Sequence, residues 1–392
     1  MLLVSILIPL VGAALLFLLR PKNAMVRNLL VMVTALLTSA MVAVCLFTPG
    51  DHGIVLLRLS TLLTVSFKLD GLGRVFAGLV AFLWPLASLY GLEYMRHEGG
   101  ETHFFGFYLI SYAVTLSIAF SEDLMSLYVF YELLTLATLP LVMHGMKAKN
   151  VHAGRTYAYY CLGGAALAFM SLVTVIHYGG SSNFTAGGIA GLAAAPQGVV
   201  LTMYVLGFFG FGVKAAIFPL HRWLPDAGVA PTPVTALLHA VAVVKAGVFA
   251  VTRLTYSCFG ADLLRGTWAQ TLCLCVALFS ILFGSSMAVK EQHMKRRLAY
   301  STMSNLSYIL FGVLLMTPQG LAAGLTHMLY HGLMKIVLFC CVGAIMIYTE
   351  RNDIRQMRGL AKVMPFTSAL FLVCSVALVG IPPLIGFGSK WA

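Results

Sequence analysis

The sequence predicts an all-α membrane protein with about twelve transmembrane helices. Of its 392 residues, 60% are hydrophobic and only 10% are charged, and the mean hydropathy is +0.92. A soluble fold needs far more polar surface than this composition supplies. Apolar runs of about 20 residues, long enough to cross roughly 30 Å of hydrocarbon as a helix, recur from one end of the chain to the other. Lipid is therefore expected to be the main solvent.

Twelve such runs follow one another with short polar connections, and each boundary carries an error of about two to four residues. The first run is expected to be a retained helix rather than a signal peptide. Met1 is followed at once by Leu2 and Leu3, with neither a basic start nor a convincing cleavage site before Arg20 and Lys22. The runs are expected at residues 2–19, 28–48, 75–92, 104–120, 124–143, 157–177, 199–220, 233–252, 268–289, 298–316, 321–348 and 365–392.

The net charge of +12 comes from cations in the loops. Sixteen of the 25 Lys and Arg residues follow odd-numbered runs, and only five lie on the opposite side: Arg58, Lys68, Arg74, Arg253 and Arg265. This asymmetry is the positive-inside pattern of membrane proteins, not a nucleic-acid-binding surface. It predicts an outside N-terminus and cytoplasmic loops after the odd-numbered helices, in the cytoplasmic (inner) membrane of a prokaryote.

The cysteines give no sign of a cofactor site. Nearly all of them lie inside apolar runs, without a CxxC pair or a Cys/His array, so they are interpreted as small apolar side chains. No ligand set for an iron–sulfur cluster or haem is visible, and the chain is expected to hold no cofactor and to do no redox chemistry itself. The eight cysteines are Cys45, Cys161, Cys258, Cys273, Cys275, Cys340, Cys341 and Cys374.

Five charged residues fall inside the apolar runs: Glu132, Lys214, Lys245, Lys335 and Lys390. A charge near the bilayer centre costs at least about 2.5–3.5 kcal/mol, so five of them suggest a function. The structural alternatives are a lysine that reaches the headgroups, for Lys335 or Lys390, and a packing ion pair between Glu132 and Lys214. In the functional interpretation, a buried lysine binds or releases its proton according to whether a carboxylate lies close to it.

Two stretches rich in proline and glycine interrupt the apolar runs next to these lysines. Phe218–Pro233 contains four prolines and Gly228, between Lys214 and Lys245, and Gly380–Gly388 precedes Lys390. Irregular backbone at membrane depth is tolerated where it is buried in protein or lines a wet cavity, and inverted-repeat transporters place their ion sites at such breaks.

Histidines extend the set of candidate site residues. His327, His331 and Lys335 are spaced four apart, so they lie along one side of a helix and could line a shared channel. This spacing also resembles a metal-binding pair, but no acidic third ligand is near. His239, six residues before Lys245, is equally compatible with a relay and with an interhelical hydrogen bond.

These motifs together resemble the antiporter-like subunits shared by respiratory complex I, Mrp-type cation/proton antiporters and membrane-bound hydrogenases. The segments that carry the resemblance cover most of residues 120–392, in the family's order. They read KAAIFPLHRWLPDA from Lys214, APTPVTALLHAVAVVKAG from Ala230, KRRLAYSTMS from Lys295, HMLYHGLMK from His327, and GIPP followed by GFGSK, ending at Lys390.

The resemblance implies fourteen helices with two inverted five-helix repeats, each holding one broken helix. It divides the chain into residues 1–103 with helices 1–3, residues 104–252 as the first repeat, and residues 268–392 as an incomplete second repeat. It also implies roles: Glu132 as the glutamate of the fifth helix, Lys214 as its partner in the broken seventh, Lys245 as the connecting lysine of the eighth, Lys390 as the terminal lysine or glutamate of the twelfth, and His239, His327, His331 and Lys335 at relay positions.

Two departures from the family pattern stand out. Family members usually carry an acidic residue shortly before the KRRLAYS motif, where this chain has His293 and Met294. The chain also ends at Ala392, within the twelfth helix, so the resemblance predicts further helices beyond it.

The expected function is proton translocation, linked to Na⁺ as an alternative, by a membrane subunit of a redox-driven respiratory or hydrogenase complex. Flavin, iron–sulfur clusters or a NiFe centre would then belong to partner subunits. One alternative is an Mrp-type cation/proton antiporter subunit without a redox partner. Another is a structural membrane anchor for redox subunits, in which the buried charges only fix the packing.

Overall fold

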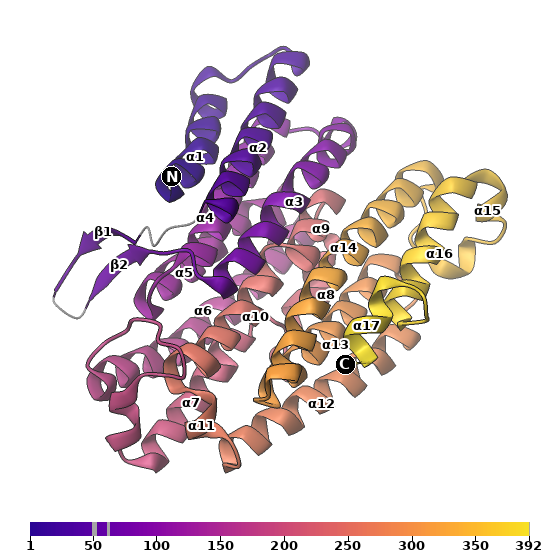
Figure 1. Ribbon diagram of the computed structural model, residues 1–392. Helices are drawn as coiled ribbons and strands as arrows, with labels where there is room; N and C mark the ends of the chain where they lie inside the picture. The colour runs from indigo at the N-terminus through magenta and orange to yellow at the C-terminus, as the bar shows by residue number, and fades with distance from the viewer. Residues whose placement is uncertain (49–52, 61–62, 392) are drawn as a thin grey trace.

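The computed structural model describes residues 1–48, 53–60 and 63–391, which form a helical bundle with one small sheet at its side (Figure 1). Nine helices in these described ranges are long and apolar enough to cross a membrane, and two shorter apolar helices of 16 and 15 residues accompany them. The prediction of a helical membrane protein is therefore confirmed. The number of twelve transmembrane helices stays a prediction.

Three of the N-terminal helices, α2, α3 and α5, begin at polar side chains that cap them. Asn23 accepts a hydrogen bond from the Met25 amide, and Asp70 and Asp123 cap their helices in the same way. Helix α1 packs against both α2 and α4. The elements of this part are α1 (Leu2–Leu19), α2 (Ala24–Phe47), α3 (Gly71–Tyr94), the 3₁₀ helix η1 (Met95–His97), α4 (Glu101–Phe120) and α5 (Leu124–Val142).

A β-hairpin between α2 and α3 was not predicted. Strands β1 (Ile54–Arg58) and β2 (Thr64–Phe67) pair antiparallel, with Ile54 opposite Phe67 and an irregularity between Val55 and Leu57. The hairpin projects from the side of the bundle (Figure 1). Its apolar residues alternate too little to distinguish it from a loop.

The middle of the chain contains the interrupted helices. Helix α6 starts nine residues before its predicted boundary, because its first turns carry Lys149, Asn150 and Arg155 and give no apolar signal. The elements are α6 (Ala148–Gly179), η2 (Ala190–Ala194), α7 (Gln197–Gly212), α8 (Trp223–Asp226), η3 (Ala227–Val229), α9 (Thr232–Ala240), α10 (Val243–Arg253) and the π-helical turn η4 (Leu254–Phe259).

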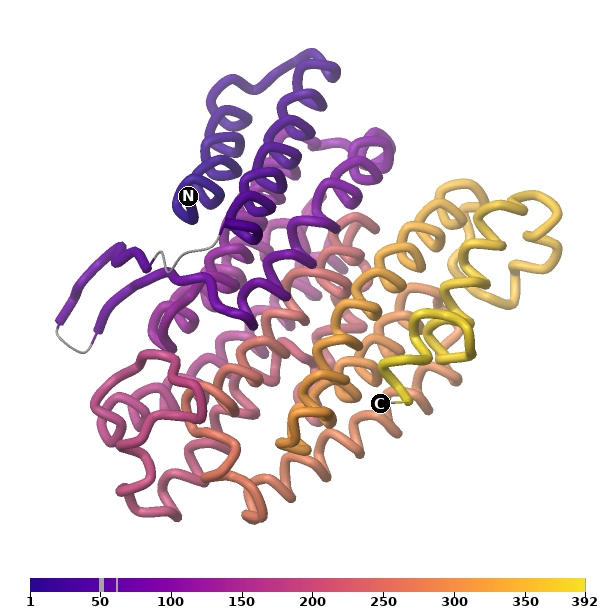
Figure 2. The backbone as a smooth tube through the Cα atoms, viewed as in Figure 1, coloured from indigo at the N-terminus to yellow at the C-terminus, as the bar shows by residue number. Residues whose placement is uncertain are grey.

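The last helices, α15 to α17, lie on the side of the bundle opposite α1 and α2 (Figures 1 and 2). The break predicted at Gly380–Gly388 is present, since α16 ends at Val379 and the next helix begins at Ile385. The elements are α11 (Ala261–Leu264), α12 (Trp268–Lys290), α13 (Met294–Leu314), α14 (Pro318–Thr349), η5 (Ile354–Gln356), α15 (Leu360–Val363), α16 (Pro365–Val379) and α17 (Ile385–Trp391).

The segment Thr232–Phe259, which holds α9, α10 and η4, forms the centre of the bundle. All residues of its apolar stretch are buried, against 28% for Trp268–Lys290 and 33% for Ala24–Phe47 at the periphery. A charged side chain on α9 or α10 therefore lies inside protein and not against lipid.

The predicted break at Phe218–Pro233 is also present, and the chain between α7 and α9 forms only the short turns α8 and η3. Its polar backbone groups are satisfied by side chains: Trp223 Nε1 donates to the Val213 carbonyl at 2.8 Å, and the Phe218 amide donates to Ser280 Oγ at 2.9 Å. Such bonds replace the missing helical ones at membrane depth.

A third interruption of the helices, between α9 and α10, was not predicted from the sequence. The predicted helix 233–252 stops at Ala240 and restarts at Val243, and the Ala242 amide bonds the Leu237 carbonyl at 2.9 Å, five residues back. Neither proline nor glycine marks this position in the sequence. The interruption lies three residues before Lys245.

Candidate functional site

Glu132 and Lys214 form an ion pair in the bundle. Glu132 lies on α5 and Lys214 in the irregular segment after α7, and Lys214 Nζ is 4.0 Å from Glu132 Oε1. The Lys214 side chain is completely buried, whereas 19% of the Glu132 side chain is exposed. The pair predicted from the sequence is therefore brought together.

Tyr131 holds the lysine in place. Lys214 Nζ donates a hydrogen bond to the Tyr131 carbonyl and lies 3.5 Å from the centre of the Tyr131 ring. The Tyr131 hydroxyl donates in turn to the Phe211 carbonyl at 2.7 Å, close to the end of α7. One residue next to Glu132 thus contacts both the lysine and the helix end that precedes it, a role that the sequence did not indicate.

Helix α10 approaches the Lys214 backbone closely at Gly247. A Cβ atom at Gly247 would lie 2.4 Å from the Ala215 amide nitrogen and 3.0 Å from Lys214 Cβ. Only glycine fits between these backbones. Gly247 lies two residues after Lys245, so the same contact fixes α10 next to the Glu132–Lys214 pair.

Gly247→Ala is expected to destabilise the protein by about 1–3 kcal/mol, because the added methyl group meets backbone atoms that cannot move aside. The matched control is Gly163→Ala on α6, where a Cβ would have nothing within 4 Å and alanine should stabilise the helix by about 0.5–1 kcal/mol. Thermal unfolding of both variants in one detergent measures the difference. Equal melting temperatures would contradict the close approach.

A second set of site residues runs from α10 to α14. Lys245 Nζ is hydrogen-bonded to His331 Nδ1, and both side chains are completely buried. The His331 and His327 rings, one helical turn apart, have centroids 6.2 Å from each other. The predicted spacing along one side of the helix is therefore observed, and the interruption before α10 places Lys245 against it.

His327 connects this set to the C-terminal break. Its Nδ1 is 2.9 Å from Ser389 Oγ and its Nε2 is 3.1 Å from Asn305 Oδ1. Ser389 and Asn305 belong to α17 and α13, so three helices meet at one histidine. Neither residue was singled out in the sequence.

Lys390 lies at the break itself. Its Nζ donates to the carbonyls of Leu378 at 2.8 Å and Val379 at 3.4 Å, the last residues of α16, and lies 5.1 Å from the Tyr308 ring centre. The Lys390 side chain is exposed and lines a cavity of about 580 Å³. Polar residues of this cavity include Ser301, Ser304, Asn305, Tyr308 and Ser375.

His239 and Lys335 lie apart from the Lys245–His331 contact. His239 is completely buried and packs against the Phe339 ring at 4.8 Å between centroids. Lys335 is also completely buried and donates to the Leu298 carbonyl at 3.0 Å, so it does not extend to the headgroups. No direct hydrogen bond joins either residue to the other site residues in the described ranges.

Several buried polar atoms of the site have no hydrogen-bond partner among the described residues: Glu132 Oε1, His331 Nε2, and both ring nitrogens of His239. Buried polar atoms in native proteins normally bond to protein or to ordered water. Groups of three or more His, Cys, Asp or Glu that could hold a metal ion do not occur in the described part of the chain.

The assignment of Arg253 to a loop was wrong, whereas its side of the membrane stays a prediction. Arg253 ends α10, is 1% exposed, and donates two hydrogen bonds to the Asp70 carboxylate at the start of α3. The Arg253 guanidinium also packs against the aromatic rings of Phe184 and Phe249. Lys295, also assigned to a loop, is buried and donates to the Ala230 carbonyl at 3.0 Å. The apolar residues on both sides of Arg253 were the feature of the sequence that could have indicated its burial.

Asp70→Asn is expected to destabilise the protein by about 1–3 kcal/mol, because it leaves the buried Arg253 charge without a carboxylate, while the Asp70 side chain is 41% exposed and asparagine can still cap α3. The control is Asp262→Asn, whose exposed pair with Arg265 at 3.5 Å should contribute less than about 1 kcal/mol. Thermal unfolding in detergent compares the two. A smaller loss for Asp70→Asn than for Asp262→Asn would contradict the importance of the buried pair.

The stability that the Asp70–Arg253 pair gives to the folded protein depends on pH. Burial raises the pKa of Asp70, but the Arg253 hydrogen bonds and charge outweigh it and hold the pKa below its usual value. A carboxyl with a lowered pKa in the folded state stabilises that state above its unfolded pKa of about 3.9. This contribution is lost as the pH falls through the folded pKa.

Comparison with known proteins identifies the family to which this chain belongs. The family model described as "NADH:quinone oxidoreductase/Mrp antiporter, TM" matches residues 121–392. Hydrogenase-4 component B of Escherichia coli is 32% identical over 83% of this chain and 50% of its own length. A protein of Rhizobium meliloti, described as part of a probable K(+)/H(+) antiporter, is 34% identical over 84% of this chain and 32% of its own length. The chain thus spans half or less of these two relatives.

Two solved structures share the fold. The Mrp complex from Dietzia sp. DQ12-45-1b contains a chain with a TM-score of 0.87 and 25% identity, aligned over 99% of this chain and 42% of its own length. The membrane-bound sulfane sulfur reductase, an archaeal respiratory membrane complex, contains a chain with a TM-score of 0.86 and 23% identity, over 100% of this chain and 80% of its own. At that identity the second match concerns the fold alone.

Proposed function

Because the chain belongs to the NADH:quinone oxidoreductase/Mrp antiporter family, we propose that it moves protons across the membrane through its buried glutamate, lysines and histidines, as one subunit of a larger redox-driven complex. The observation that carries the proposal is the Lys245–His331 hydrogen bond inside the bundle. An uncharged core would pack as well or better, so stability alone is a weak reason for such groups.

The proposed path begins at Glu132 and Lys214. The two groups are 4.0 Å apart, longer than a hydrogen bond, so small side-chain movements change how strongly each stabilises the charge of the other. When the carboxylate moves away, the lysine gives up its proton more readily. The proton would then pass to Lys245, on the helix that contacts the Lys214 backbone at Gly247.

The second half of the path follows α14. From Lys245 the proton would pass through His331 and His327, whose ring nitrogens can accept and donate protons. Ser389 is hydrogen-bonded to His327 and precedes Lys390 in the sequence. It therefore connects the histidines to Lys390, which is the proposed exit. The cavity beside Lys390 supports this direction, because hydroxyl and amide side chains stand among its apolar lining residues, and a proton leaving the lysine needs polar or hydrated surroundings.

His239 and Lys335 are proposed to take part through water. Both are buried at the centre of the bundle, and the His239 ring nitrogens have no protein partner in the described ranges. Water that bridges polar groups maintains nearly the strength of direct hydrogen bonds, so a hydrated path does not need direct contacts between all members. The same reasoning applies to Glu132 Oε1 and His331 Nε2, which have no hydrogen-bond partner among the described residues.

The complex is proposed to couple this path to an electron-transfer reaction in partner subunits, which would hold the flavin, iron–sulfur clusters or NiFe centre. Relatives named as a component of hydrogenase-4 and as part of an NADH-quinone oxidoreductase support such partners. The relative named for a K(+)/H(+) antiporter, together with the match to an Mrp complex, favours a second candidate, a cation/proton antiporter subunit without a redox partner.

Gentle solubilisation from the native membrane, followed by proton-uptake assays in vesicles, tests the proposal. Co-purification of subunits with flavin or iron–sulfur centres, together with proton uptake driven by their electron donor, is the expected result. Proton exchange that depends on Na⁺ or K⁺, without redox subunits, would identify the antiporter instead. Unchanged transport after neutralising all five charged residues of the apolar runs, Glu132, Lys214, Lys245, Lys335 and Lys390, would support only the structural anchor.

A further inference from the structure

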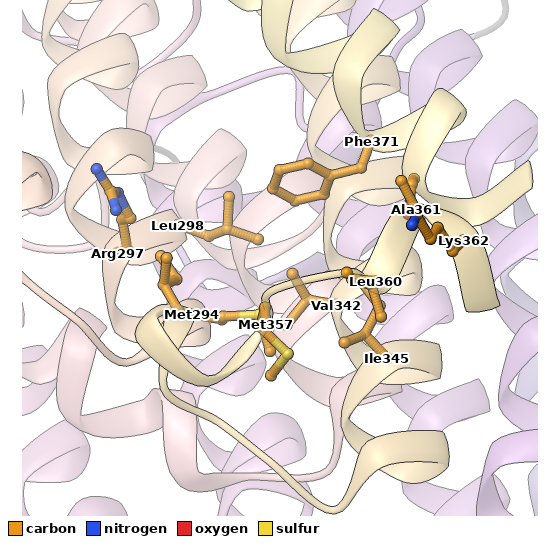
Figure 3. Close-up of a pocket in the computed structure, with 13 residues that line it drawn as sticks. Met294, Arg297, Leu298, Val342, Ile345, Met357, Leu360, Ala361, Lys362 and Phe371 are labelled. Carbon is orange, nitrogen blue, oxygen red and sulfur yellow. The ribbon is translucent and has the colours of Figure 1, made fainter. Parts of the chain in front are cut away.

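An apolar cavity of about 650 Å³ lies between α13, α14 and the segment that holds α15 and α16 (Figure 3). Its wall consists mainly of aliphatic side chains, methionines and one aromatic ring, among them Leu298, Val342, Ile345, Met357 and Phe371. Cavities of this size bind small molecules and bury most of their surface.

Two cations flank this apolar wall. Arg297 at the start of α13 and Lys362 on α15 both line the cavity, and Figure 3 shows them on opposite sides of the apolar side chains. In the described part of the chain neither side chain has an ion pair or a side-chain hydrogen bond, whereas the neighbouring Arg296 and Arg355 pair with acidic residues. Their charges are therefore available to a bound anion.

A hydroxyl group adds a hydrogen-bond donor. Ser368 on α16 lines the same cavity, and its buried Oγ has no partner among the described residues. An unpaired buried hydroxyl costs free energy unless a ligand or water bonds it. The cavity therefore offers an apolar wall, two free cations and one free donor.

Two loops that contribute Met294 and Ile354 to the cavity wall are joined by backbone hydrogen bonds. The Met294 amide donates to the Asn352 carbonyl at 3.0 Å, and the Ile354 amide donates to the Gln292 carbonyl at 3.1 Å. Both loops carry clustered cations, and both follow odd-numbered predicted helices, which places them on the same side of the membrane.

We propose that this cavity binds an anionic phospholipid. One acyl chain lies against Leu298, Val342 and Phe371, and the two cations that flank this wall, Arg297 and Lys362, attract the anionic headgroup. Ser368 donates to an ester or phosphate oxygen. Charge decides the occupant: a neutral apolar molecule would leave both cations unpaired, and a free phosphate would leave the apolar wall empty.

The test is the lipid retained by the purified protein. The protein is reconstituted with equal amounts of phosphatidylglycerol and phosphatidylcholine, extracted again in mild detergent, and its bound lipids are identified by native mass spectrometry. The wild type is expected to retain mainly phosphatidylglycerol. Replacing both cations, R297Q with K362Q, should lower this preference about 25-fold, since each cation near an anionic lipid contributes roughly a fivefold gain.

A matched control replaces Arg351 and Arg358 with glutamine. Both are exposed cations of the same loop, and neither lines the cavity, so the lipid preference should remain. Ala361→Trp fills the cavity with both cations intact and should release the bound lipid. Equal retention of both lipids by the wild type would overturn the proposal, and so would a control that loses the preference. Retention of no lipid by the wild type, as expected if a protein segment covers the cavity, would also overturn it.

Discussion

Replacing Lys214 with alanine is expected to stop proton transfer in vesicles while the protein still assembles. Lys214 is the completely buried member of the Glu132 pair and contacts both the carbonyl and the ring of Tyr131. Removing a group that takes part in positioned proton transfer lowers the rate by about 10²–10⁴-fold. Glu132→Gln, which keeps the shape of the side chain, should have an effect of the same kind.

The measurement is proton uptake by vesicles containing equal amounts of each variant, with assembly checked by size-exclusion chromatography. Lys290→Ala is the control, because Lys290 is an exposed lysine at the end of α12 and should leave the rate unchanged. A purely structural ion pair would give the opposite pattern, with reduced melting temperature and normal transport per folded molecule. Normal transport in either pair variant would remove this mechanism.

The second large effect is expected for Lys245→Met, which keeps most of the side-chain volume but removes the amino group bound to His331. It should lower proton uptake by about 10²-fold or more, because no other hydrogen bond joins α10 to the histidines of α14 in the described ranges.

Combining Lys245→Met with Lys214→Ala separates a single path from two independent ones. If two residues act in series on one path, removing the second has no further effect once the first is gone. The double variant should then be no slower than the slower single variant. Uptake rates of the four proteins, wild type included, give the coupling. Losses that multiply would show that the two lysines serve separate routes.

The sequence predicted the charged members of this site because charge is unexpected inside an apolar run. Glu132, Lys214 and Lys245 could be identified without knowing their neighbours, and the proline- and glycine-rich stretches located two helix breaks correctly. The break at Val241 could not be found in the same way, since no residue type marks it; there the Ala240 carbonyl lies close to Gly332 of α14, where a Cβ atom would be 3.2 Å from the carbonyl oxygen.

The partners of the charged groups were also hidden in the sequence. Tyr131, Asn305 and Ser389 are ordinary residues in apolar helices, and their roles depend on which helices meet. Arg253 was misplaced because it lies at the end of a predicted helix, where a loop and a buried pair look alike in one sequence. Its carboxylate partner, Asp70, is 183 positions away.

The contact at Gly247 determines how the proposed relay can move. Because the α10 backbone touches the chain at Lys214 and Ala215, the two lysine backbones cannot approach each other further. A change in the distance between their amino groups is therefore expected to come from rotation about side-chain bonds and not from closer packing of the two backbones. Both side chains are completely buried, so such a rotation requires neighbouring side chains to move as well and is slower than the rotation of an exposed group.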